Sequence, residues 1–175
     1  MTLKRTAIVA ALTLTLAATV SAAVALAAQR GQAPFSEARQ ATARFHDVDK
    51  AVAAGYAEFH DAADIACIDL PGTGGMGVHF VNGNLVGDDA LDPRTPEALV
   101  YERRGGKLHL VALEYIVFES AWQGIRPPAL FGQTFDYVAA GNRYGLPPFY
   151  ALHAWLWKPN PAGHLEAWNP RVSCE

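Results

Sequence analysis

The stretch Lys107–Phe118, which reads KLHLVALEYIVF, decides the fold. Nearly all of its residues are β-branched, aromatic or aliphatic, and two glycines precede it. Such a run is typical of a central strand that is buried on both faces. Alternation along the strand places Glu114 on the same side as Leu110, Ala112, Ile116 and Phe118. A carboxylate on this side must find polar partners, because burying it unpaired costs several kcal/mol.

Further strands are predicted around this one, because similar apolar runs are bounded by glycine, proline and asparagine. They cover Ile65–Leu70, Met76–Asn82, Ala98–Arg103 and Phe149–Lys158. Before them, apolar residues at spacings of three and four predict a helix that Ser36 caps: Ala38, Ala41, Phe45, Val48, Val52 and Tyr56. The expected fold is therefore α+β, with one N-terminal amphipathic helix packed on a curved, mainly antiparallel sheet of about five strands. A small β-barrel is the alternative.

The N-terminal stretch has the features of a targeting signal. Lys4 and Arg5 precede the apolar run Ala7–Val20, and small residues follow it. The alternative is a retained membrane anchor, since the stretch from Ala7 to Ala28 is just long enough to span a bilayer. We therefore predict three segments: a signal peptide at residues 1–27, a flexible lead-in at 28–35 and a single α+β domain at 36–175.

Charge and cysteine content restrict the environment of the protein. The net charge is −3 and no cluster of Lys or Arg is present, which argues against nucleic acid or an anionic membrane as a partner. The two cysteines, Cys67 and Cys174, are expected to form a disulfide in an oxidising compartment, with two free thiols as the alternative. We predict an exported protein, periplasmic or extracellular, with no stable membrane anchor after signal cleavage.

The best partners for Glu114 are His79 and His153, each in the middle of its own apolar run. Two imidazoles and one carboxylate on neighbouring strands can bind a divalent transition metal such as Zn, Fe or Cu and leave positions open for a ligand. Without a metal, the carboxylate can fix the tautomer of a histidine that acts as a general base. The third alternative is a buried polar network that stabilises the sheet.

Aromatic residues near these three predict an apolar pocket. Tyr115 and Trp155, together with Phe149 and Trp157, are candidates to line it, although such residues more often belong to a core. We expect Phe149, His153, Trp155 and Trp157 to share one side of the last strand.

Four runs carry a resemblance to known proteins: GMGVHFVN, LVALEYIVF, LHAWLWKPNPAG and WNPRVSC. They resemble an uncharacterised family of exported bacterial proteins, over most of the chain from Ala41 to Cys174. The resemblance implies export and a single domain, and it implies no activity.

Two classes of function follow. In the first, the protein binds a metal ion or a small molecule in a pocket built on His79, Glu114 and His153. In the second, it is a non-catalytic structural or interaction module, and the same three residues form a polar network. The sequence leaves open whether the protein is an enzyme, and no nucleophile elbow or nucleotide-binding loop is apparent.

Overall fold

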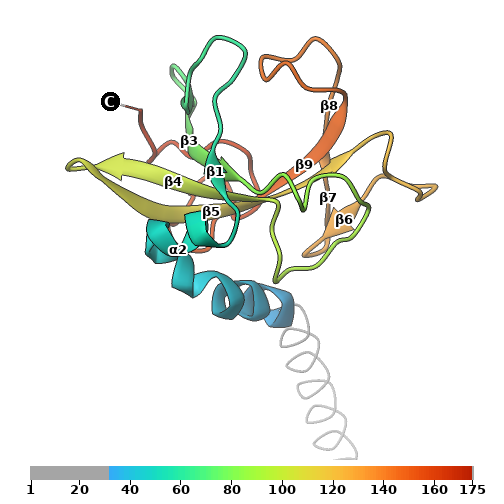
Figure 1. Cartoon of the computed structure of the whole chain (residues 1–175), viewed down its shortest axis with the longest axis horizontal. Coiled ribbons are helices and arrows are strands. Elements are labelled where there is room, and N and C mark those ends of the chain that lie inside the picture. The colour runs from blue at the N-terminus through green and yellow to red at the C-terminus, as the bar shows by residue number, and fades with distance from the viewer. Residues whose placement is uncertain (1–31, 175) are drawn as a thin grey trace, which may run out of the picture.

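The computed structural model of the chain describes residues 32–174 (Figure 1). The predicted signal peptide at residues 1–27 lies outside the described residues, as do residues 28–31 of the lead-in and Glu175. Within residues 32–174, no helix is both long and apolar enough to cross a membrane.

The described part of the chain has a short helical region followed by strands. Residues 32–42 are α-helical and continue into the 3₁₀-helix η1 (Ala43–His46) and the helix α2 (Val48–Ala53). The strands are β1 (Ala57–Glu58), β2 (Cys67–Leu70), β3 (Gly74–Val81), β4 (Ala98–Arg104), β5 (Lys107–Phe118), β6 (Ala129–Leu130), β7 (Gln133–Thr134), β8 (Asp136–Val138) and β9 (Phe149–Ala154).

These strands form one large antiparallel sheet and a separate hairpin. The sheet has the order β1-β3-β4-β5-β9-β8 with β2 also paired to β3, while β6 pairs only with β7. Figure 1 shows the helical region on one side of the sheet, below β4 and β5. The predicted α+β fold is confirmed. Because the order begins and ends on different strands, the sheet is open and the β-barrel alternative is wrong.

The helix starts earlier than the sequence predicted. It is already formed at residue 32, so Ser36 lies inside it instead of capping it. Residues 32–35, which were expected to be a flexible lead-in, belong to the same helix. The buried side chain of Phe45 anchors this region to the sheet, and its carbonyl accepts a hydrogen bond of 2.7 Å from the Tyr101 hydroxyl.

The helical region also breaks where continuous periodicity was expected. Asp47 has extended backbone angles (φ −90°, ψ 106°), and its side chain accepts a hydrogen bond from the Asp49 amide at the start of α2. This break resets which residues face the sheet. Val52, which an unbroken helix would bury, is 55% exposed, whereas Ala51 is fully buried.

A bulge in β5 changes which of its residues share a face. Val100 pairs with Ala112 but Tyr101 pairs with Leu110, so Val111 is an extra residue without a partner on β4. Such an insertion inverts the alternation on either side of it. Leu110 therefore joins the core on the helix side, and the prediction that it shares a side with Glu114 is wrong.

The C-terminal segment is held against β2 and β3. Cys67 and Cys174 form the predicted disulfide, 107 residues apart in sequence. Gly75 and Asn169 exchange backbone hydrogen bonds of 3.1 and 3.0 Å, which bring the segment alongside β3. The disulfide is consistent with an oxidising compartment.

Candidate metal centre

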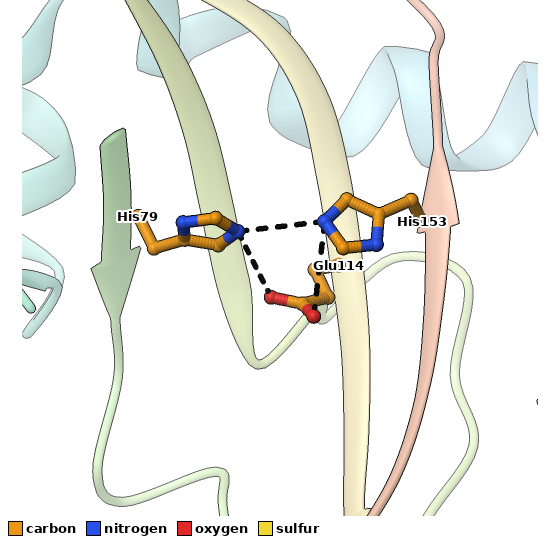
Figure 2. A group of neighbouring side chains, drawn as sticks. All are labelled: His79, Glu114 and His153. Carbon is orange, nitrogen blue, oxygen red and sulfur yellow. Dashed lines mark hydrogen bonds and ion pairs between the residues drawn. The ribbon is translucent and has the colours of Figure 1, made fainter. Parts of the chain in front are cut away.

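Glu114, His79 and His153 converge on the face of the sheet opposite the helices (Figure 2). Glu114 on β5 and His153 on β9 lie directly opposite each other in the antiparallel register. Cross-strand neighbours of this kind have Cβ atoms only about 5 Å apart, so the strand pairing alone brings these two side chains into contact. The sequence-based prediction of this trio agrees with the geometry.

His79 reaches the other two across an intervening strand. It lies on β3, and β4 separates β3 from β5. At this point β4 contributes two small buried residues, Ala98 opposite Glu114 and Val100 opposite His79. Because the methyl group of Ala98 occupies little space, the longer side chains meet above it. Figure 2 shows His79 and His153 approaching the carboxylate from opposite sides.

The distances between the polar atoms suit a metal ion better than hydrogen bonds. His79 Nε2 lies 3.4 Å from His153 Nε2 and 3.4 Å from Glu114 Oε2, and His153 Nε2 lies 3.8 Å from Glu114 Oε1. Hydrogen bonds between protein groups are usually about 2.7–3.2 Å long, so all three contacts are long for hydrogen bonds. Two ligand atoms of a tetrahedral zinc ion, each about 2.0–2.1 Å from it, are separated by about 3.4 Å. The three side chains therefore leave room for an ion between them.

Burial keeps all three groups uncharged at neutral pH in the metal-free protein. Loss of hydration raises the pKa of Glu114 to about 8, and the nearby charge of Glu97 adds to this. Loss of hydration also lowers the pKa of His79 to about 4 and that of His153 to about 3. Their contacts with Glu114 are therefore not ion pairs at neutral pH. Neutral imidazole is the form that binds metals, so both histidines are ready to act as ligands.

Gly77, two residues before His79, lets β3 pass close to β4. The ring nitrogen of His79 that faces Glu114 and His153 is Nε2, so it is the nitrogen in position to bind a metal. Gly77 has φ +105°, and a Cβ added there would lie 2.5 Å from the Tyr101 carbonyl oxygen, so only glycine fits.

Trp155 supports His153 from the next position on the same face. The two rings are nearly parallel, with an interplanar angle of 17° and centroids 6.2 Å apart. The indole Nε1 of Trp155 donates a hydrogen bond of 2.6 Å to the Glu166 carbonyl, which fixes the ring in place. Trp155 is thus a buried support behind His153. The sequence analysis named Trp155 as a candidate to line a pocket, but it is not among the residues that line the cavity beside the trio.

An apolar cavity of about 260 Å³ opens beside the trio. His79 and Glu114 form its polar base. Its other lining residues come from the sheet and from two loops: Phe59, Val81, Gly83, Val86, Ile116, Phe118, Tyr144, Leu146 and Phe149. Of the four aromatic residues proposed to line a pocket, Phe149 is among the residues that line this cavity.

An ion pair holds the loop wall of this cavity in place. The Arg143 guanidinium donates two hydrogen bonds, of 3.0 and 2.7 Å, to Asp61 Oδ2. The other carboxylate oxygen of Asp61 accepts from the backbone amides of Ala63 and Ile65. These bonds hold the pKa of Asp61 below its usual range, with the Arg143 bond as the largest cause. Tyr144, next to Arg143, is thereby positioned over the cavity.

Two predicted pocket residues lie on the opposite face. Tyr115 belongs to the core on the helix side, where its hydroxyl donates a hydrogen bond of 2.8 Å to the Pro93 carbonyl. Trp157 follows the end of β9 and packs on the same side, with its ring 4.5 Å from that of His46. The first error follows from neglecting that neighbours alternate along a strand, and the second arises because β9 ends at Ala154.

Sequence reasoning missed Glu97, a second buried carboxyl group. Its Oε2 accepts a hydrogen bond of 2.9 Å from the Ile116 amide, and burial raises its pKa to about 8. It also missed the loop residues Phe59, Tyr144 and Leu146, because loops have no periodicity from which a facing direction can be read.

Comparisons of the chain with protein-family models, curated proteins and solved structures found no match. The resemblance to exported bacterial proteins therefore stays a prediction.

Proposed function

We propose that the protein is an exported metal-binding protein in which His79, Glu114 and His153 hold a divalent transition metal at the base of the cavity. The observation that carries this proposal is the spacing of the two histidine Nε2 atoms and the two Glu114 carboxylate oxygens on a buried sheet face, where the three contacts are 3.4, 3.4 and 3.8 Å long. Buried polar groups that serve only stability are expected to close to hydrogen-bond distance, because every gap costs interaction energy.

Zinc is the metal that this geometry favours among Zn, Fe and Cu. Two imidazoles and one carboxylate are a known ligand set for catalytic zinc, with a fourth position left for water or a ligand. Octahedral iron with bonds of about 2.1 Å requires neighbouring ligand atoms about 3.0 Å apart, and square-planar copper requires a similar spacing. The two distances of 3.4 Å match the tetrahedral spacing, and the third, 3.8 Å, is longer than any of these arrangements requires.

The open position faces the apolar cavity, since His79 and Glu114 are the residues of the trio that line it. A metal in this place can bind the polar group of a small molecule, and as a Lewis acid it can polarise that group or lower the pKa of a bound water. The binding function needs only the open position, so we propose binding as the function.

Metal analysis of the protein, purified without a histidine tag, tests the proposal. We expect close to one zinc per chain after exposure to equimolar Zn²⁺ and removal of the excess. Glu114→Gln removes the anionic ligand with little change of shape and is expected to abolish zinc retention while the fold is kept. Glu97→Gln is the matched control, since it alters the other buried carboxyl group and should leave zinc bound. A zinc-free wild type, or full retention in Glu114→Gln, contradicts the proposal.

A second function is favoured by one specific observation, namely that all three groups are uncharged at neutral pH without a metal, because burial shifts each pKa. On this alternative the trio is a neutral polar network inside a non-catalytic module whose exposed loops contact a partner. The wild type then retains no zinc, and Glu114→Gln chiefly lowers the melting temperature.

A further inference from the structure

We propose that the ligand of this centre is a small aromatic carboxylic acid, whose carboxylate takes the open metal position and whose ring fills the cavity. This inference rests on the proposed metal site and adds the chemical class of the ligand to it.

The walls of the cavity select an apolar ligand body. Beyond His79 and Glu114, its lining side chains are aliphatic or aromatic, and the one further polar group is the Tyr144 hydroxyl. This hydroxyl is directed to the Met76 sulfur, 3.6 Å away. A ligand with polar groups along its body would lose their hydration without gaining hydrogen bonds in return, which is strongly unfavourable. The polar part of the ligand must therefore lie at one end, beside the metal.

The charge of the metal centre at the base of the cavity favours a ligand with a single negative charge. A divalent ion with one carboxylate and two neutral imidazoles carries a net charge of +1, and the three side chains that hold it are buried. No Lys or Arg is among the described residues that line the cavity, and nearby Arg143 is bound to Asp61. One carboxylate on the ligand neutralises the centre, whereas a second would be buried without a partner.

The size and shape of the cavity select one ring. An apolar cavity of about 150 Å³ is enough to hold benzene. The cavity here is about 260 Å³, which leaves space for a ring with its carboxylate and one small substituent. Three aromatic side chains are arranged around it, with Tyr144 centred 5.9 Å from Phe149 and 6.4 Å from Phe59. A ring inserted among them gains the edge and face contacts that aromatic groups prefer.

Calorimetric titration of the zinc-loaded protein tests the inference with three probes. 4-Methylbenzoate carries the ring and the charge, 4-methylbenzamide carries the same ring without charge, and acetate carries the charge without the ring. We expect 4-methylbenzoate to bind at least about tenfold more tightly than either of the others, because each lacks one of the two interactions. Equal affinity for 4-methylbenzoate and either control overturns the inference.

A pair of variants tests the location of binding. Val86 is half-buried in the cavity wall, so Val86→Asp places a negative charge in the cavity that the ligand would occupy while leaving the three metal ligands intact. We expect zinc to be retained and 4-methylbenzoate affinity to fall about tenfold through charge repulsion. Val52→Asp adds the same charge on the exposed side of α2 and is expected to leave the affinity unchanged. An unchanged affinity in Val86→Asp, with zinc bound, overturns the inference.

The failure of the metal site and the failure of the ligand class are distinguishable. A wild-type protein that retains no zinc contradicts the proposed function, and the inference falls with it. A protein that retains zinc but does not bind 4-methylbenzoate contradicts the inference alone. Equal binding of 4-methylbenzoate to the zinc-loaded protein and to the protein stripped with EDTA also overturns the inference, because the metal is then not what holds the carboxylate.

Discussion

Replacing Glu114 by glutamine is expected to stabilise the metal-free protein at neutral pH. At pH 7 the unfolded chain carries an ionised carboxylate at this position, because the ordinary pKa is 4.5. In the folded protein, burial raises the pKa of Glu114 to about 8, so the group takes up a proton on folding. This uptake costs about 1.4 kcal/mol for each pH unit above the ordinary pKa, which amounts to about 3 kcal/mol at pH 7. Glutamine avoids this cost, since its amide does not ionise.

The difference in the free energy of unfolding between the wild type and Glu114→Gln should depend on pH. A carboxyl group whose pKa is raised in the folded state destabilises the protein progressively as the pH rises from the ordinary value towards the raised one. His79 and His153 become protonated in the unfolded chain near their ordinary pKa of 6.5, but this contribution is the same in the wild type and in Glu114→Gln and cancels in the comparison. Between the ordinary and the raised pKa of Glu114, the free energy of unfolding of the wild type should fall by about 1.4 kcal/mol per pH unit relative to Glu114→Gln.

Urea unfolding in the presence of EDTA, followed by circular dichroism at pH 6.5, 7.0 and 7.5, measures the stability difference between the two proteins and its change with pH. Glu119→Gln, which alters an exposed carboxyl group just beyond β5, is the control and should track the wild type. If Glu114→Gln is less stable than the wild type at pH 7 and shows the same pH dependence, then Glu114 is not a strained buried acid, and the polar-network alternative is favoured.

Three further outcomes can be measured by urea unfolding. Replacing both Cys67 and Cys174 by alanine should lower the free energy of unfolding by about 5 kcal/mol in the chain-entropy model, because the disulfide spans 107 residues; a loss below about 1 kcal/mol would contradict this. Gly77→Ala should cost about 2–4 kcal/mol and weaken zinc retention, since its φ is +105° and the added methyl meets a β4 carbonyl; wild-type stability would refute the strain argument. Asp61→Asn should destabilise the protein most at neutral pH. The pKa of Asp61 is lowered in the folded state, so its ionised carboxylate stabilises the protein at pH values above the ordinary pKa of 3.8. This stabilisation is lost as the pH falls through the lowered pKa. A pH-independent effect of Asp61→Asn would show that the ion pair with Arg143 is not its cause.

The long strands could be predicted because they are runs of residues with a strong preference for buried sheets. The run Lys107–Phe118 has the same bounds in the sequence analysis and in the structure, and the hairpin before it follows from Gly105 and Gly106. The trio could be predicted for a related reason, since an acid in an apolar strand requires partners and the chain offers two histidines in similar runs.

Features that depend on non-local contacts could not be predicted. At the bulge, the Val111 carbonyl accepts hydrogen bonds from the Trp157 and Lys158 amides, which lie beyond the end of β9. No local sequence pattern predicts this pairing. The break at Asp47 has a similar origin, because it allows Phe45 and Tyr56 on either side to reach the same core. The cavity walls depend on loop positions that the pair Arg143 and Asp61 sets across 82 residues of sequence.

The placement of small residues on β4 explains why a polar cluster can exist in this sheet at all. The backbones of β3 and β5 are separated by two strand spacings, about 9.5 Å, so side chains from them meet only over a short residue on β4. Ala98 supplies that residue directly opposite Glu114, and it is fully buried beneath the cluster. A sheet selected for stability alone would fill this place with a larger apolar side chain, because each added buried methylene contributes about 0.8 kcal/mol. Ala98 and Glu114 therefore both lower the stability of the sheet at the same point. This pattern is expected at a functional site and supports the proposed binding of a ligand there.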